Sequence, residues 1–416
     1  MSPTPSPVTS PPEAASSRRY DLDWIRVAAF FLLIVYHVGV FYEPDSDWHT
    51  SSPRAIEGIE MAMSLSSPWR LALLFLIAGF ATRFMTARLS PGLRGAGALA
   101  RSRTGRLFVP LVFGMLVIVP PQTWFQVAQY TPHLVEPWPQ FYALYLSGEH
   151  QWDITTPTWN HLWFVAYLWV YSLVLAGLLA VTGDGLPRLG RWLDRTMSGA
   201  ALLIVPVLYL GLARQLYPVF DRTHALVDDW YLHSVYLPLF LFGFLIARSE
   251  RIRLALIANR WAALGLALTA WLAWWTYLLT WTGLPGDIQI WTPVAENPPS
   301  WLRIAMRWTY AAIQWGAIAA ILGFGARHLN FDRPALRYLT VAVFPLYILH
   351  QTITVVAGHY LPRLELPLGL EAALLVAITF GGAFAGYELV RRIPPLRPFF
   401  GLRFRPRPAN RPPRAP

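Results

Sequence analysis

Ten apolar runs divide this chain, and most of them are long enough to cross a lipid bilayer as a single helix. They lie at approximately 24–42, 68–87, 107–126, 161–181, 200–213, 230–248, 261–282, 302–325, 339–358 and 369–390. The chain is 55% hydrophobic and 14% charged, and a water-soluble core of 416 residues does not bury that much apolar surface. We therefore expect an all-α, polytopic integral membrane protein with about ten transmembrane helices. The run interrupted by Pro206 is the shortest of them.

Arginine is unevenly distributed among the segments that connect these runs. Of the 34 arginines, 27 fall in alternate segments, and the chain contains no lysine. These segments are 18–26, 83–106, 188–195, 248–260, 327–337 and 391–414. The intervening segments hold seven arginines and most of the acidic residues. Because cytoplasmic loops carry the excess of positive charge, we expect both termini in the cytoplasm and an even number of spans.

The two ends of the chain differ in composition from the apolar part between them. Residues 1–17 are rich in Pro, Ser and Thr, and we expect them to be disordered. Residues 394–416 form a basic, Arg- and Pro-rich tail, expected to lie against anionic lipid rather than to bind nucleic acid. Residues 18–393 then form one membrane domain of ten helices. The first apolar run is too long for a secretory signal and contains ionisable residues.

The first run carries two of those residues, Arg26 near its start and His37 well inside. Eleven residues apart, they lie about 16 Å apart along a helix and within roughly 20° of the same face. An ionisable residue inside a membrane span is costly, and its default interpretation is functional. The alternatives are an arginine that extends to the lipid headgroups and a structurally hydrogen-bonded histidine. A basic group at the cytoplasmic mouth and a titratable base farther out suit an anionic ligand that enters from the cytoplasm.

Further candidates cluster near the ends of other spans. The segment RSRTGRLFVP places Arg101, Arg103 and Arg106 at the cytoplasmic entrance of the third span, where they indicate either a phosphate site or ordinary positive-inside charge. His161 and Trp163 open the fourth span at the outer interface, at about the depth of His37. His350 lies in the middle of the ninth span and needs a hydrogen-bond partner there, and His359 lies at its outer end. The Ala78-Gly79 pair in the second span is expected to allow close helix packing.

Several kinds of chemistry are excluded by what the sequence lacks. The chain has no cysteine, which removes disulfides and thiolate catalysis. Its histidines lack the i, i+4 spacing of a helical zinc site, and no phosphate-binding loop or dinucleotide fingerprint is present. We therefore expect no bound metal and no bound cofactor.

Four motifs together resemble the membrane-bound acyltransferase 3 family. They are the Arg26-x10-His37 pair, FLIAGF at 75–80, RTGRLFVP at 103–110 and LYILH at 346–350. Within that family, YDLDWIR (20–26), DWHT (47–50), HLWF (161–164) and YELVRRIPPLRPFF (387–400) resemble the branch that succinylates periplasmic glucans. The matches keep one order over nearly the whole chain. The chain departs from the family at Ala78, where a serine is usual.

The resemblance implies ten spans in a bacterial inner membrane, a cytoplasmic acyl-CoA donor and an extracytoplasmic sugar acceptor. His37 matches the essential histidine of the family, and Arg26 matches its companion arginine. We expect His37, Arg26 and His161 to be catalytic, with Arg26, Arg101, Arg103 and Arg106 holding the CoA phosphates. Substrate contacts are assigned to Asp47, His49, Trp163 and His350. His37 would act as general base on the sugar hydroxyl, or would carry the acyl group as an acyl-histidine intermediate.

Two other functions remain open at this point. One alternative keeps the same chemistry and has lipopolysaccharide or exopolysaccharide as the acceptor. A proton-coupled transporter is the alternative from another class, with His37 as proton relay and Arg26 as anion site, although we find no internal repeat of the kind that such transporters often show. The acyl group, succinyl or acetyl, and the oligomeric state are not determined by the sequence.

Overall fold

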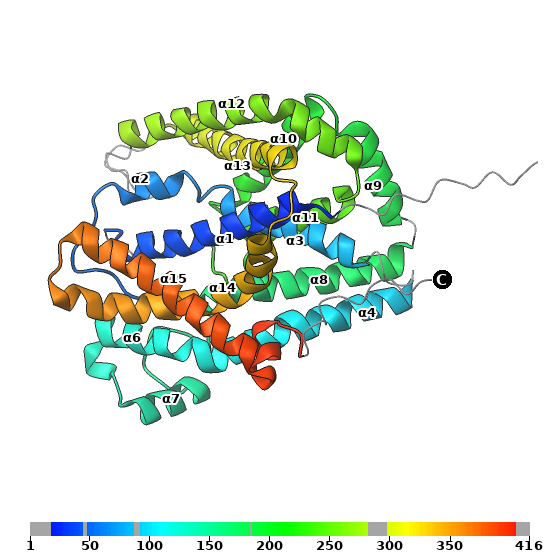
Figure 1. Ribbon diagram of the computed structural model, residues 1–416. Coiled ribbons are helices and arrows are strands. Elements are labelled where there is room, and N and C mark those ends of the chain that lie inside the picture. Colours follow the sequence, from blue (N-terminus) through cyan, green and yellow to red (C-terminus); the bar gives the residue numbers. More distant parts are fainter. Residues whose placement is uncertain (1–17, 45–47, 87–91, 184, 282–297, 405–416) are drawn as a thin grey trace, which may run out of the picture.

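The computed structural model describes residues 18–44, 48–86, 92–183, 185–281 and 298–404, and no β-strand occurs in these ranges (Figure 1). The predicted disordered segment 1–17, Asp47 and the last part of the basic tail lie outside them. The α-helices are α1 (Tyr20–Phe41), α2 (Ile59–Ser64), α3 (Arg70–Thr86), α4 (Leu93–Arg103), α5 (Val109–Phe113), α6 (Pro120–Tyr130), α7 (Trp138–Ser147), α8 (Trp163–Thr182), α9 (Gly185–Thr196), α10 (Ala201–Ala213), α11 (Trp230–Ile246), α12 (Glu250–Trp281), α13 (Ser300–His328), α14 (Pro334–Tyr360) and α15 (Leu368–Arg392). Short π- or 3-10 helices are η1 (Thr104–Phe108), η2 (Gly114–Ile118), η3 (Pro132–Leu134), η4 (Asn160–Leu162), η5 (Arg214–Leu216), η6 (Leu361–Leu364) and η7 (Pro394–Phe400).

Every apolar run predicted as a span is helical, but not every helix is long enough to qualify by itself. Among the described residues, six helices have the length and apolarity of a membrane span, or seven when the bent pair Leu93–Ile118 and Pro120–Tyr130 counts as one. The helices Ala201–Leu216 and Trp230–Ile246 are apolar but shorter. A helix of 17 residues rises about 25 Å, less than the ~30 Å of a hydrocarbon core. The protein is therefore an all-helical polytopic membrane protein, and the count of ten spans remains a prediction.

The third predicted span is broken into several pieces. Two π-helical turns, η1 and η2, flank α5, and the chain bends by 41° before α6 begins. Pro120 starts α6, where its missing N–H leaves no helix bond unmade. Turns of π-helix concentrate at functional sites, and η1 contains Arg106.

Glycine allows helices α3 and α11 to pack in close contact. A Cβ on Gly79 would lie 2.0 Å from the carbonyl oxygen of Phe240, and one on Gly243 would lie 2.1 Å from the carbonyl oxygen of Leu76. Both contacts are with backbone atoms, which side-chain movement cannot relieve. The packing role predicted for the second span is thereby confirmed for Gly79.

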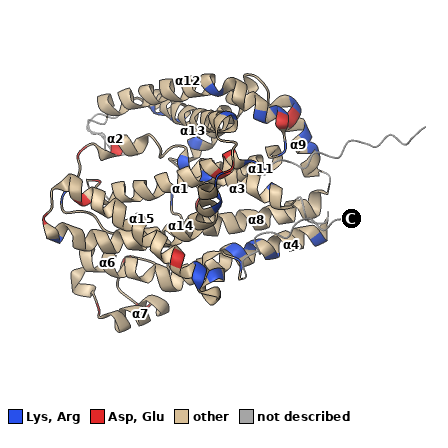
Figure 2. Cartoon of the chain, viewed as in Figure 1, with Lys and Arg blue, Asp and Glu red and all other residues tan. Residues whose placement is uncertain are grey.

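The basic residues gather at one end of the helical bundle. Figure 2 shows arginines along α4 and α9 at the right-hand end of the view, whereas α2, α6 and α7 lie toward the other end. The start of the predicted tail also belongs to this packed body. Phe399 and Phe400 of η7 contact Phe113 at ring distances of 4.8 and 5.5 Å. The predicted boundary at residues 393 and 394 thus does not coincide with the end of side-chain packing, because two aromatic rings follow it.

Candidate functional site

Two histidines from distant parts of the sequence form a pair between α1 and α14. Nδ1 of His37 lies 2.9 Å from Nε2 of His350, and the two rings are nearly parallel at 5.1 Å. His350 is fully buried, and its Nδ1 lies 2.6 Å from the carbonyl oxygen of Tyr347. These contacts supply the partner that a histidine in the middle of a span requires.

The hydrogen bonds of this pair determine which nitrogen of His37 carries a lone pair. The carbonyl of Tyr347 can only accept, so Nδ1 of His350 carries the proton and its Nε2 accepts when the ring is neutral. Nδ1 of His37 must then donate to His350, which leaves the lone pair of His37 on Nε2. No hydrogen-bond partner of that nitrogen is found among the described residues. The pair therefore presents one oriented, unengaged imidazole base.

His161 connects η4 to α14 rather than to His37. Its Nε2 donates to the carbonyl oxygen of Ile348 at 3.1 Å, and the hydroxyl of Tyr347 donates to the backbone carbonyl of His161. Its ring lies edge-on to His350 at 5.2 Å. Nδ1 of His161 is buried without a partner, and as an acceptor it cannot donate to an oxyanion. In this geometry His161 positions the segment of α14 that holds His350.

Sequence reasoning missed a buried group of amide side chains beside the histidines. Gln122 of α6 accepts hydrogen bonds from Asn160 at 3.0 Å and from Gln351 at 3.1 Å. Gln122 also donates to the hydroxyl of Thr352 at 2.7 Å. Asn160 and Gln351 directly precede or follow a histidine in the chain. The sequence contained one signal that could have identified this network, namely polar residues within or beside apolar runs.

The loop after α1 adds further rings near His37. Trp48 stacks on His37 at 6.1 Å with an angle of 12° between the ring planes, and the next residue, His49, donates from Nδ1 to Gln126 at 2.8 Å. Burial lowers the pKa of the His49 imidazole, and the hydrogen bond to Gln126 opposes this shift. Asp47 lies outside the described residues.

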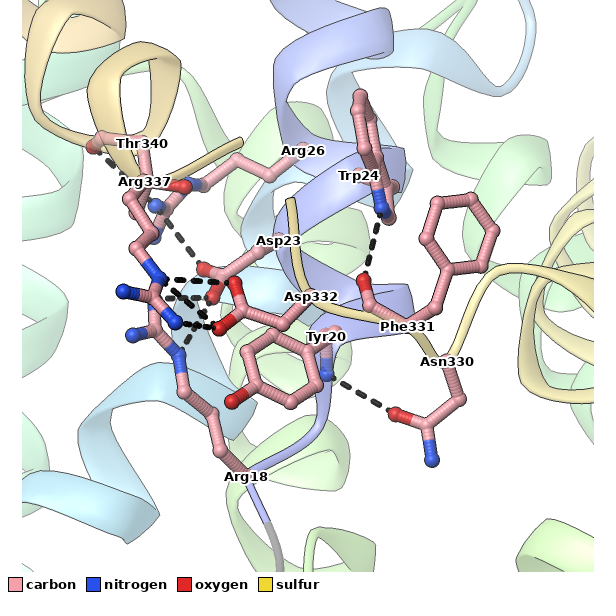
Figure 3. Close-up of polar contacts among 10 residues, drawn as sticks. All are labelled: Arg18, Tyr20, Asp23, Trp24, Arg26, Asn330, Phe331, Asp332, Arg337 and Thr340. Atoms are coloured by element: carbon pink, nitrogen blue, oxygen red, sulfur yellow. Dashed lines mark hydrogen bonds and ion pairs between the residues drawn. The ribbon is translucent and has the colours of Figure 1, made fainter. Parts of the chain in front are cut away.

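Arg26 also faces α14, about three helical turns from His37. Its Nη2 donates to Asp23 at 3.2 Å and to the carbonyl oxygen of Thr340 at 3.4 Å. Figure 3 shows Asp23 between Arg26 and Arg18, with Asp332 beside Arg337 close by. The predicted shared face of Arg26 and His37 is thus present, with both side chains bonded to one helix. Arg26 already has a carboxylate partner.

The arginines of the third span do not all come together. Arg103 is buried and donates to the hydroxyl of Thr82, and its charge interacts with that of Arg106. Arg106 interacts in turn with Arg26 and Arg403. The side chain of Arg101 is exposed, as is that of Arg106, and it forms no hydrogen bond or ion pair with the described residues. Adjacency in sequence grouped the three, but the helix directs Arg101 to another side.

A separate cavity of about 410 Å³ lies between α3, α9, α11 and α12. Arg83, Arg191, Arg248 and Arg251 line it, together with Asp194 and Glu250. None of these four arginines takes part in an ion pair of the described ranges. This cavity is a second place in which phosphate groups would meet several guanidiniums.

Trp163 is not part of the histidine pair. Its ring packs against His224 at 4.4 Å, Tyr167 at 5.1 Å and Tyr236 at 6.0 Å. Trp163 thus forms part of an aromatic cluster whose described ring contacts do not include His37.

Arg70, which the sequence reasoning did not select, lies close to the pair. It is 3% exposed, donates to Ser66 at 2.8 Å and stacks at 3.7 Å over the ring of Tyr36, the residue before His37. Its charge acts on the His37 ring, and Nε is buried without a partner. No carboxylate of the described residues forms an ion pair with it. Nor do the described residues contain a group of three His, Cys, Asp or Glu side chains that would hold a metal ion.

Comparisons with known proteins agree with these observations. The family model described as an acyltransferase domain matches residues 19–388. Glucans biosynthesis protein C of Escherichia coli K12 is 23% identical over 398 residues, covering 92% of this chain and 94% of the relative. The protein of the same name from Escherichia coli O6:K15:H31 matches at the same identity and coverage. No solved structure matches the chain.

Proposed function

The chain belongs to the acyltransferase 3 family, and from that membership we propose that this membrane acyltransferase moves an acyl group from acyl-CoA to a hydroxyl of a periplasmic glucan. The name shared by its relatives, glucans biosynthesis protein C, supports a glucan as the acceptor. The observation that carries the proposal is the free Nε2 of His37, oriented by His350. The proposed location is a bacterial inner membrane, with the donor on the cytoplasmic side.

In the proposed reaction, the oxygen of the sugar hydroxyl attacks the carbonyl carbon of the thioester. Nε2 of His37 takes the proton of that hydroxyl at the same time. The carbon–sulfur bond then breaks, the ester forms, and the CoA thiolate leaves with the proton returned by the imidazolium. His350 accepts from Nδ1 of His37 throughout and so keeps the reacting nitrogen aimed. His161 and Tyr347 act as positioning residues, because they bond to the backbone around His350.

On the donor side, Arg26, Arg103 and Arg106 would hold the CoA phosphates. Their mutual repulsion without an anion supports this assignment. The separation of about 16 Å between Arg26 and His37 suits the extended pantetheine arm. Arg101 is omitted from this group because the charges that act on Arg103 and Arg106 come from Arg106, Arg26 and Arg403.

Arg70 favours succinyl over acetyl as the acyl group. A succinyl group carries a second carboxylate, and Arg70 is a buried cation beside His37 with no acid of the described residues to neutralise it. Arginine recognises carboxylates through two parallel hydrogen bonds. An acetyl group would leave this guanidinium uncompensated.

The test uses the purified full-length protein in lipid nanodiscs, supplied with succinyl-CoA or acetyl-CoA and with glucan, lipopolysaccharide or exopolysaccharide. We expect succinyl ester on the glucan and none in the His37→Ala variant at equal abundance. Arg70→Gln should reduce succinyl transfer and spare acetyl transfer. Undiminished transfer by His37→Ala would remove the base from the mechanism, and transfer only to another glycan would replace the acceptor.

A further inference from the structure

Arg214, in η5 at the end of α10, is a buried arginine that the proposed reaction does not use. Only 6% of its surface is exposed, and its Nη1 donates to the hydroxyl of Tyr231. The guanidinium carbon lies 3.4 Å from the ring centre of Tyr310 and 4.9 Å from that of Tyr217. Nε is buried and has no hydrogen-bond partner. Three tyrosines therefore surround a cation without supplying a negative charge.

The described part of the chain offers Arg214 no carboxylate partner. The ion pairs of the described residues involve other arginines. The buried carboxylate of Asp229 accepts from the hydroxyl of Tyr167 and the N–H of His224. Burial of an unpaired charge is costly, and stacking on tyrosine recovers only part of that cost. Such an arrangement is typical of a site whose counter-ion arrives with a ligand.

The surroundings of Arg214 add positive rather than negative charge. Arg222 lies 5.0 Å from the ring centre of Tyr217, and it is exposed. Arg307 is half-buried, donates to Gln215 at 3.1 Å, and has an unpartnered Nε. Exposure thus increases from Arg214 through Arg307 to Arg222. This gradient describes a buried cation with a more accessible cationic rim.

Arg214 and Arg70 contact different tyrosines. Arg70 stacks on Tyr36 beside His37, whereas Arg214 contacts Tyr217, Tyr231 and Tyr310. Arg70 is therefore the buried cation next to the reacting base, and Arg214 is a separate buried cation. A ligand anion at Arg214 then belongs to a different group from the acyl chain.

We propose that Arg214 binds an oxyanion, a phosphate or a carboxylate, carried by the acceptor sugar. Tyr217, Tyr231 and Tyr310 hold the guanidinium of Arg214 in place, and Arg307 and Arg222 attract the anion to the rim. Assigning the anion to the acceptor rests on the proposed function, whereas the anion site itself does not. The acceptor is thereby expected to be an anionic rather than a neutral glycan.

The first experiment measures binding without catalysis. The protein in nanodiscs is heated with glucose 6-phosphate, glucuronate, inorganic phosphate or glucose, and the midpoint of unfolding is recorded. We expect glucose 6-phosphate or glucuronate to raise the midpoint in the wild type, glucose to leave it unchanged, and Arg214→Gln to abolish the increase. The control is Arg363→Gln, which alters an arginine bonded to His359 and should retain the increase. No increase in the wild type, or an equal increase in Arg214→Gln, overturns the anion site. An equal increase with inorganic phosphate alone overturns the assignment to a sugar.

A second variant covers the case in which Arg214→Gln does not fold. Tyr231→Phe removes the hydroxyl that accepts from Arg214 and keeps the ring, so it should weaken sugar-phosphate binding while preserving the fold. An undiminished increase in the unfolding midpoint of Tyr231→Phe would count against the proposed orientation of Arg214.

A kinetic experiment then separates the two proposals. Acyl transfer is measured to one oligosaccharide in neutral form and in a form that carries a phosphate. We expect KM for the phosphorylated form to be about tenfold lower than KM for the neutral form, which is the factor that one charge-assisted contact contributes. Arg214→Gln should make the two KM values equal. Equal KM values in the wild type overturn the acceptor assignment. Absence of all transfer refutes the proposed function, and the binding result for Arg214 then stands alone.

Discussion

Arginines at the two ends of α1 have opposite kinds of neighbours. At the end where α1 begins, Arg18 and Arg26 share Asp23, and Arg19 pairs with Asp21. At the end that holds His37, Arg70 and Arg214 are buried among tyrosines without a carboxylate in the described residues. A cation paired within the protein is stable with or without a ligand, whereas a buried unpaired cation is stabilised only when an anion binds. The difference identifies Arg70 and Arg214 as cations that an anionic group of a ligand would stabilise.

The largest expected effect concerns the pair of His37 and His350 at the histidine end of α1. His350→Phe removes the acceptor that orients His37, and we expect it to lower kcat by about 10²-fold, toward the lower end of what a positioned general base contributes. His350→Gln supplies an amide oxygen to the same N–H and should restore part of the rate. His359→Gln, at the far end of the same helix, is the matched control. Equal rates for His350→Phe and the wild type would show that the pair is structural.

The next effect is on the stability of the protein. It compares a buried charge that has a partner, Glu371, with a buried charge that has none among the described residues, Arg214. Glu371 is fully buried, pairs with Arg54 and accepts from the hydroxyl of Tyr42. Glu371→Gln should destabilise the protein by about 2–3 kcal/mol, less than for a fully buried pair because Arg54 is partly exposed. Arg214→Met should leave the ligand-free unfolding midpoint unchanged or raise it. A loss from Arg214→Met as large as that from Glu371→Gln would contradict the distinction between the two arginines.

A smaller effect tests the donor end. Arg106→Gln should raise the KM for acyl-CoA about tenfold, one charge-assisted contact, with kcat little changed. Arg101→Gln, exposed on another side of the same segment, should change neither constant. If instead Arg248→Gln raised the KM and Arg106→Gln did not, the cavity between α3, α9, α11 and α12 would be the donor site.

The smallest effect is a dependence of stability on pH in the loop next to Arg222. Burial, assisted by the charge of Arg222, lowers the pKa of His224 to about 4, from about 6.5 in an unfolded chain. The folded protein therefore binds fewer protons than the unfolded chain between these values, and stability falls as the pH decreases from about 6.5 to about 4. Unfolding midpoints measured across this range should fall less steeply in His224→Gln. The same slope in both proteins would assign the acid sensitivity to other groups.

The fold was largely predictable because apolar runs report helices directly. All ten predicted runs are helical, yet α10 and α11 are too short to qualify as spans by themselves, and the third run is broken by two π-turns. Phe113 lies between the two π-turns and packs against Phe399 and Phe400, nearly 300 residues farther along the chain. Hydropathy does not encode such packing.

The site was predicted one residue at a time and not as an arrangement. His37, His161 and His350 were selected because each is costly inside an apolar run, but the bond between His37 and His350 spans 313 positions that no local pattern connects. Arg70 and Arg214 were missed because they belong to the seven arginines outside the basic loops. Only the basic loops were used to predict the orientation of the chain in the membrane. Arg101 was included because it lies in the same basic segment as Arg103 and Arg106.

Helix α14 contacts two residues of α1 that lie about three helical turns apart. The carbonyl oxygen of Thr340 accepts a hydrogen bond from Arg26, and His350 accepts one from His37. A displacement of that helix by one residue along its axis, about 1.5 Å, would break both contacts together. In the proposed reaction, a shift of α14 would therefore change the surroundings of Arg26 and the orientation of the His37 imidazole together. An inhibitor that displaces α14 at one membrane surface would therefore also disturb the α14 contact near the other surface.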